Sequence, residues 1–176
     1  PEPFLMSQIF IVGPIMFLVN TTSHMPALAV LDVMLKMEWH KDEVFDSIGD
    51  MMEWLCDVRR IPFFIGIRIA RAIVAPLIYM ASAIVVKWLV IGKFKPGKRD
   101  TTSEWDLVRH YLAATLFSRE AMQDCTKLLG RHYELISILY RMLGAKVGKR
   151  VFWPGHQPVF SGEFDLLEIG DDVVFG

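Results

Sequence analysis

The chain has 176 residues and a formal net charge of −1, and hydrophobic residues make up 53% of it, for a mean hydropathy of +0.35. The length suits one ordinary domain, and the apolar excess excludes a disordered protein, a nucleic-acid-binding tail and a typical small soluble enzyme. The near-zero charge gives no electrostatic basis for a nucleic-acid partner. Because the sequence begins at Pro1 and stops at Gly176 within a strand-like stretch, we expect a piece of a longer polypeptide.

The first membrane segment is predicted at residues 1–35. Between Phe4 and Leu31 there is no Lys, Arg, Asp or Glu, and about 20 apolar residues are enough for a helix to cross a bilayer. The polar run at residues 20–24 leaves two alternatives, one span entered at Phe4 or a short span followed by an apolar turn. A secretory signal is a weaker interpretation, because the segment lacks a positive amino-terminal region and an Ala-x-Ala site.

Residues 36–60 are predicted to form an amphipathic interfacial helix, because apolar side chains recur at helical spacing and acidic side chains fall mostly on the other face. A second membrane segment is predicted at residues 61–92. Within it, the stretch from Ala72 to Ile91 has Lys87 as its only charged side chain. Lys87 is close to the end of the span, so we expect its ammonium to reach the membrane interface.

A basic linker is predicted at residues 93–103, which begin KFKPGKR. The positive-inside rule puts this linker and the region after it in the cytoplasm. The opposite end of the second span also carries basic side chains, which weaken the asymmetry of charge on which that rule depends. They are Arg59, Arg60, Arg68 and Arg71.

Residues 104–144 are predicted to form a helical adaptor of soluble amphipathic helices. Ser103 is positioned to cap a helix that begins at Glu104, Ser118 to begin a second helix, and Gly144 to end a third as a C′ glycine. The buried face of the first helix is expected to contain Trp105, Val108, Leu112, Thr115 and Leu116.

The two cysteines, Cys56 and Cys125, are too far apart in sequence to indicate a disulfide framework or a metal-ligand spacing, and we expect each to be a small buried hydrophobic residue. Four of the histidines likewise share no spacing typical of a metal site. They are His24, His40, His110 and His132. We therefore expect no metal ion.

Residues 145–176 contain one short motif twice. Val147-Gly148-x-x-Val151 and Ile169-Gly170-x-x-Val173 each place an aliphatic residue before a glycine and again four positions on. This pattern is typical of the left-handed parallel β-helix, in which each hexapeptide turns one aliphatic side chain inward. The motifs are 22 residues apart, which is not a whole number of hexapeptides, so we expect an excursion at residues 153–158. The predicted fold is therefore mainly α, with membrane and amphipathic helices followed by the first coils of a left-handed parallel β-helix.

The stretches YRMLGAKVGKRVFWPG and FDLLEIGDDVVFG resemble the carboxy-terminal region of membrane-bound non-ribosomal peptide synthetases of the polylysine-synthetase type and their fungal relatives. The resemblance covers Trp105 to Gly176. In that family, adenylation and carrier domains precede membrane helices that alternate with domains similar to hexapeptide-repeat acyltransferases. The resemblance implies that the chain contributes to carrier-dependent acyl or aminoacyl transfer to an amine. It also implies ATP and a phosphopantetheine carrier for the parent, with no cofactor in this piece, and the lipid bilayer and the parent's adenylation and carrier domains as partners.

Aminolysis of a thioester needs a base that takes a proton from the amine. His156 is the candidate catalytic residue, because it lies in the loop expected to project from the coil, where hexapeptide acyltransferases have a catalytic histidine; the alternative is a structural loop histidine. Glu163 and Asp165 are candidate substrate-binding carboxylates, with solvated coil corners as the alternative. A non-catalytic membrane scaffold is the second hypothesis for the whole chain. In both cases we expect this piece to be inactive by itself.

Overall fold

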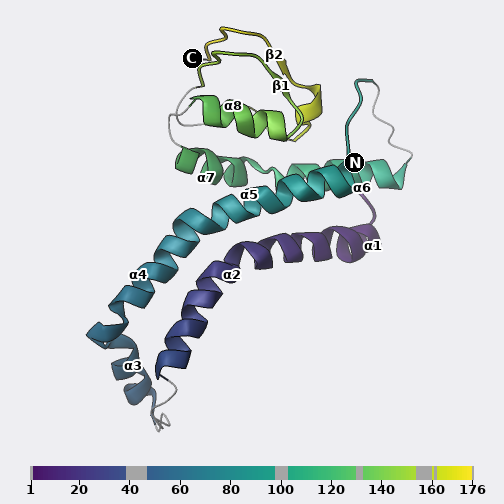
Figure 1. Ribbon diagram of the computed structural model, residues 1–176. Helices are drawn as coiled ribbons and strands as arrows, with labels where there is room; N and C mark the ends of the chain where they lie inside the picture. The colour runs from purple at the N-terminus through teal and green to yellow at the C-terminus, as the bar shows by residue number, and fades with distance from the viewer. Residues whose placement is uncertain are drawn as a thin grey trace.

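The computed structural model describes residues 2–38, 47–97, 103–129, 133–153, 160 and 162–175. Two long apolar helices lie side by side, and a cap of shorter helices and two short strands covers one end of the pair (Figure 1). The described part is mainly α, which confirms that part of the predicted fold class.

The first long helix runs without a break through three consecutive segments. They are α1 (Leu5–Ser7), the π-helical η1 (Gln8–Val12) and α2 (Gly13–Glu38). Of the two alternatives for this region, the structure has one continuous helix, and the polar run at residues 20–24 lies inside it.

The buried polar side chain of Ser23 forms its hydrogen bond within α2 itself. Ser23 is 2% exposed, and its hydroxyl donates to the carbonyl of Asn20 at 2.7 Å, so a polar residue does not force a turn here. Pro26 also lies inside α2 and has no N–H for the helical hydrogen bond. Figure 1 shows α2 bending along its length, and Pro26 is the residue that explains such a bend.

The second long helix is also continuous and runs antiparallel to the first (Figure 1). A Cβ on Gly66 would lie 3.4 Å from Val30 of α2, so the glycine allows the two helices to approach closely. Gly92, with φ +69°, ends the helix. Its segments are η2 (Val58–Arg60), α4 (Ile61–Ile69), the π-helical η3 (Ala70–Val74), α5 (Ala75–Val86) and the π-helical η4 (Lys87–Ile91).

Two stretches, Leu5–Lys36 and Val58–Ile91, are long and apolar enough to cross a membrane. Length and composition are the basis of that statement, and core helices and signal sequences share both properties. A minority of each apolar window is buried, 11% of the first and 28% of the second. We call the two helices together the hairpin.

α3 (Ile48–Cys56) precedes the second helix and begins with a capping box, in which Ser47 and Asp50 each accept from the other's backbone N–H. The first part of the predicted amphipathic helix, residues 39–46, lies outside the described residues. Cys56 is exposed, so the expectation that it is buried is wrong, whereas Cys125 is buried as expected. Cys56 is the last residue of the short helix α3, and the next two residues, Asp57 and Val58, are exposed as well.

The cap contains α6 (Glu104–Leu116), α7 (Arg119–Leu129) and α8 (Tyr133–Met142). Ser103 and Ser118 accept from the backbone N–H groups of Asp106 and Ala121, at 3.5 and 3.4 Å, which confirms both predicted helix starts. Val108, Leu112 and Leu116 are buried as expected. Trp105 is 48% exposed, so its predicted burial is wrong, because it lies at the first turn of α6, beyond the edge of the core.

Gly144 ends α8 as the sequence predicted. Its φ is +103°, and the N–H groups of Gly144 and Ala145 donate to the carbonyls of Arg141 and Tyr140, both at 3.0 Å. This pair of hydrogen bonds is the Schellman motif, in which a glycine at C′ allows the chain to reverse.

The strands β1 (Lys146–Val147) and β2 (Glu168–Ile169) pair in parallel, and Phe152 and Val174 form a further parallel bridge. η5 (Phe164–Leu166) lies just before β2. The described residues thus contain a small parallel sheet of two strands, with Val147 opposite Ile169, and do not show the predicted β-helix. Most of the predicted excursion at residues 153–158 lies outside the described part, which lacks residues 154–158.

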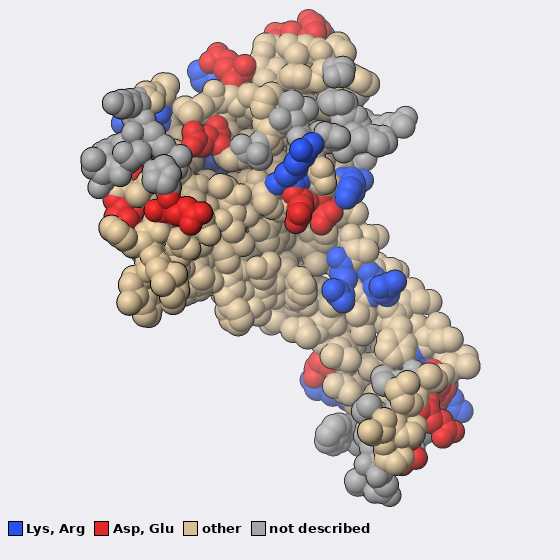
Figure 2. Space-filling view, turned by 180° about the vertical axis from the view of Figure 1, so that it is seen from behind, with Lys and Arg blue, Asp and Glu red and all other residues tan. Residues whose placement is uncertain are grey.

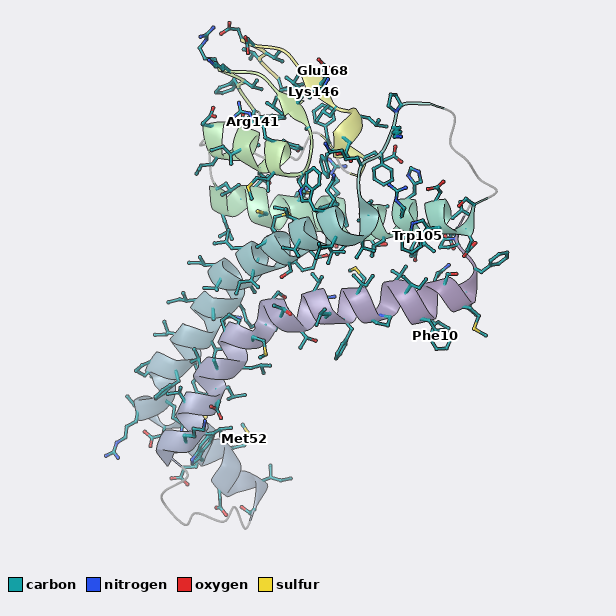
Figure 3. All side chains as sticks on the ribbon, turned by 45° about the vertical axis from the view of Figure 1, so that its right-hand side comes forward. Phe10, Met52, Trp105, Arg141, Lys146 and Glu168 are labelled. Carbon is teal, nitrogen blue, oxygen red and sulfur yellow. The ribbon has the colours of Figure 1, made fainter. Side chains whose placement is uncertain are left out.

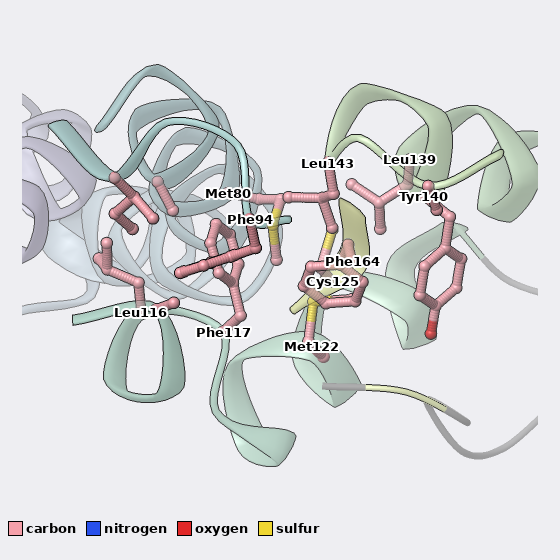
Figure 4. Close-up of a cluster of buried hydrophobic side chains, with 14 of the residues drawn as sticks. Met80, Phe94, Leu116, Phe117, Met122, Cys125, Leu139, Tyr140, Leu143 and Phe164 are labelled. Atoms are coloured by element: carbon pink, nitrogen blue, oxygen red, sulfur yellow. The ribbon is translucent and has the colours of Figure 1, made fainter. Parts of the chain in front are cut away.

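One hydrophobic core joins the hairpin to the cap. It contains Met80 of α5, Phe117 after α6, Met122 of α7, Leu143 after α8 and Phe164 of η5, all of them at most 3% exposed (Figure 4). The apolar surface of the hairpin is therefore covered by the cap at one end and left open along the rest.

Candidate functional site

An ion pair between the hairpin and the cap lies at the centre of the site. Lys87, the first residue of η4, donates to both carboxylate oxygens of Asp165 in η5, each at 2.9 Å. The Lys87 and Asp165 side chains are 1% and 6% exposed. The expectation that the Lys87 ammonium reaches the membrane interface is wrong, because this buried carboxylate binds it instead. We call this region the junction. It contains Lys87, Asp165 and their neighbours Phe94, His110, Gly144 and Glu163.

The surroundings of Asp165 fit the ion pair closely. The backbone N–H of Phe94 donates to Asp165 Oδ2 at 3.2 Å, which adds a third donor to the carboxylate. A Cβ on Gly144 would lie 2.2 Å from Asp165 Oδ1 and 3.1 Å from Lys87 Nζ. Gly144 is therefore needed twice, for its positive φ and for the space that the ion pair occupies.

A second acid–base pair lies beside the first. His110 Nδ1 of α6 is 2.6 Å from Glu163 Oε1, and the two side chains are 15% and 39% exposed. The His110 ring stacks on Phe94 with centroids 4.5 Å apart. The two atoms are close enough for an ion pair, but His110 Nδ1 is buried and the contact lacks the geometry of a hydrogen bond, so it joins α6 to the segment before η5 only as a close polar contact.

The carboxyl end of the second long helix is held by Arg109. Its guanidinium donates to the carbonyl of Ile91, to that of Lys93 at 3.0 Å and to Asp106 at 3.1 Å. Trp88 Nε1 donates to the carbonyl of Met142 at 2.9 Å. A cation close to a helix carboxyl terminus is stabilising, so these contacts fix the end of η4 against α6 and α8.

Side chains of α8 also hold the small sheet in place. Arg141 donates to the carbonyls of Val147 and Gly148 at 2.9 and 2.7 Å. Figure 3 labels Arg141 on α8 and Lys146 and Glu168 on the paired strands, where an ion pair of 3.2 Å joins the two strands. Ser137 of α8 also accepts a hydrogen bond from Trp153 Nε1 at 2.9 Å.

Of the site residues predicted from the sequence, Glu163 and Asp165 both lie in the junction, and each faces a basic partner. Their role in substrate binding stays a prediction. His156 lies outside the described residues. The sequence does not indicate that His110 lies beside Glu163, because the two residues are distant in sequence and His110 belongs to no motif.

The chemistry that the junction offers is limited by burial. The ion pair of Lys87 and Asp165 satisfies its own charges and is closed to solvent, which is typical of a structural contact. His110 is the more accessible group. Within the described residues, no group of three His, Cys, Asp or Glu side chains is placed to hold a metal ion.

Comparison of the chain with protein-family models, with curated proteins and with solved structures gives no match in any of the three cases.

Proposed function

We propose that the chain is the membrane-anchoring part of a membrane-bound enzyme similar to non-ribosomal peptide synthetases, and that it holds the beginning of an acyltransferase-like domain at the cytoplasmic membrane surface. The observation that carries this proposal is the buried ion pair between Lys87 and Asp165. It connects the last turn of an apolar hairpin directly to the segment that leads into β2. Such a contact fixes the position of the strands relative to the membrane helices.

The membrane location is supported by the apolar side chains that the hairpin exposes. Phe10 and Phe17 are each 72% exposed, and Figure 3 shows Phe10 on the side of the first helix away from the cap. A soluble protein rarely leaves such a contiguous apolar surface open to water. The basic linker at residues 93–103 puts the cap on the cytoplasmic side.

The strands are the first two coils of a left-handed β-helix in this proposal. Every parallel contact has the same offset of 22 residues, from Lys146 with Glu168 to Phe152 with Val174. Arg150 and Asp172 share this offset and a positive φ, of 56° and 58°. Equal conformations at equivalent positions are expected where one coil stacks on the next.

The reaction proposed for the parent enzyme is the aminolysis of a carrier-bound thioester. The amine nitrogen attacks the thioester carbonyl, the C–S bond breaks, and the proton lost by the amine passes through a base to the departing thiolate. His156 is the proposed base and Glu163 the proposed carboxylate near the amine, whereas Asp165 is occupied by its ion pair with Lys87. ATP-dependent activation and the phosphopantetheine thiol belong to the adenylation and carrier domains of the parent.

The second candidate is a non-catalytic membrane scaffold. It is favoured by the same ion pair, because Asp165 is fully engaged in holding the cap and is closed to solvent. In that case the strands provide an edge for assembly and the hairpin provides the anchor.

The test uses membranes from cells that make the whole polypeptide containing this chain. Retention through an alkaline carbonate wash is expected, and release would contradict membrane anchoring. Amide formation is then measured from a loaded carrier and a radiolabelled amine. We expect His156→Ala to reduce it while the polypeptide stays in the membrane. Undiminished amide formation would remove His156 as the base, and no amide formation by the wild type would support the scaffold.

A further inference from the structure

We propose that Arg68 and Arg71, together with the apolar groove beside them, bind one anionic phospholipid. The guanidinium groups hold the phosphate, and the groove takes part of an acyl chain. This inference rests on the proposed membrane anchoring and adds a lipid class and a binding site to it.

Arg68 and Arg71 have no counter-charge among the residues that the structure describes. Both side chains are exposed, and no described residue forms an ion pair or hydrogen bond with either of them. They are three residues apart, so they lie next to each other on the helix surface. The whole stretch of residues 61–91 contains no Asp or Glu.

The surface around Arg68 is apolar. A groove of about 420 Å³ runs along one face of α4 and the start of η3. Arg68 is its only charged lining residue, and the others are Ile61, Phe64, Ile65, Ile69, Ala72 and Ile73. Figure 2 shows the arm of the hairpin as an apolar surface with a small group of basic side chains partway along it. Cationic side chains beside an apolar groove match the layout of a phospholipid, which has a charged headgroup next to apolar acyl chains.

The position of the two arginines along the hairpin also fits a headgroup. Lys87 marks the level of the cap, and Arg71 precedes it by 16 residues, which is about 24 Å of helix at ~1.5 Å per residue. The hydrocarbon core of a bilayer is about 30 Å thick, and long basic side chains extend toward the interface to cover such a difference. Arg68 and Arg71 therefore lie close to the headgroups of the leaflet away from the cap, and the part of the groove on their cap side, at Ala72 and Ile73, is at the depth of an acyl chain.

A phosphate is the ligand that this geometry favours. Guanidinium groups bind phosphate oxygens with paired, charge-assisted hydrogen bonds, and leaving them unpaired at the edge of the hydrocarbon is unfavourable. Two positive charges with no acidic neighbour on their own helix favour a lipid with net negative charge over a zwitterionic one, because only the former leaves the site close to neutral.

The experiment purifies the full chain in mild detergent and adds phosphatidylglycerol and phosphatidylcholine in equal amounts. Bound lipid is counted by native mass spectrometry. We expect the wild type to retain phosphatidylglycerol at least about fivefold over phosphatidylcholine, and R68Q/R71Q to lose that preference. The control K127Q/K146Q removes the same charge from exposed lysines of the cap, at 65% and 74% side-chain exposure, and should keep it.

Two further variants separate an effect of the lost charge on lipid binding from an effect of the substitution on folding. R68K/R71K keeps both charges and should retain part of the preference. A72F fills the groove without changing the charge and should weaken lipid retention, which gives a result even where the double glutamine variant does not fold. Equal retention of the two lipids by the wild type, or unchanged preference in both R68Q/R71Q and A72F, would overturn the lipid site. Failure of the wild type to float with neutral phosphatidylcholine vesicles would instead overturn the membrane anchoring.

Discussion

Lys87 Nζ and Asp165 Oδ1 lie 2.9 Å apart, although the two residues are separated by 78 positions in the sequence. Because Lys87 is 1% exposed and Asp165 6%, neither charge has access to water when the other is missing. The pair therefore adds a buried ionic contact to the apolar contacts and hydrogen bonds, such as that of Trp88, which join the hairpin to the cap.

Loss of one partner should destabilise the junction strongly. Lys87→Met leaves the Asp165 carboxylate buried without a cation, at a cost of about 3–5 kcal/mol in the free energy of unfolding. The double variant K87M/D165L should lose much less, because no charge is left unpaired. Chemical denaturation in detergent, followed by tryptophan fluorescence, measures both. The exposed pair of Lys146 and Glu168, with both side chains 74% exposed, is the control, and K146Q/E168Q should change stability by less than about 1 kcal/mol.

Gly144 should be far less tolerant of substitution than Gly162, although both have positive φ, of 103° and 94°. An alanine Cβ at Gly144 meets Asp165 Oδ1 at 2.2 Å, whereas nothing lies within 4 Å of the same atom at Gly162. We expect Gly162→Ala to cost about 1 kcal/mol, for backbone strain. Gly144→Ala should cost several times that, and a loss equal to that of Gly162→Ala would contradict the steric argument. Thermal unfolding of the two variants side by side gives the comparison.

The two thiols should differ in reactivity. Burial raises the pKa of the Cys125 thiol to about 11, so at neutral pH it stays protonated and covered, while Cys56 is exposed. Iodoacetamide at pH 8 should modify Cys56 and leave Cys125 unmodified until the protein is denatured. Peptide mass spectrometry counts the label at each site, and equal labelling of both cysteines in the native protein would show that α7 is not packed as described.

Arg141 should be required for the start of the sheet. Replacing it with Met removes two hydrogen bonds from a charged donor to the carbonyls of Val147 and Gly148. We expect the loss to be about 1–3 kcal/mol, with faster amide hydrogen exchange in β1 and β2 than in α6. Lys127→Met, which affects an exposed contact with Asp124 on α7, is the matched change and should leave exchange in the strands unaltered.

The features that sequence predicted well are those that depend on neighbours along the chain. The helix starts at Ser103 and Ser118 and the end at Gly144 each need only a few adjacent residues, because capping satisfies local backbone groups. The sequence also marked Val147 and Ile169 as equivalent positions of a repeated motif, and the two residues pair in the sheet.

The features that sequence did not predict depend on contacts between distant elements. Neither the pairing of Lys87 with Asp165 nor that of His110 with Glu163 has a periodicity or motif, because the first arises when the cap packs on the hairpin and the second when elements of the cap pack on one another. The polar run within α2 was ambiguous for a related reason. A hydroxyl such as that of Ser23 is compatible with a turn and with a helix that supplies its own acceptor.

The π-helical segments η1, η3 and η4 affect how the hairpin should be probed by residue-by-residue labelling. Each π turn holds one residue more than an α turn, so the side chains beyond it are rotated by about 100° relative to a regular helix. A cysteine scan through residues 58–91 should therefore show its pattern of labelled positions shifting phase at Ala70–Val74, between α4 and α5. A helical wheel drawn through the whole stretch would assign the wrong side to the residues on one side of this shift.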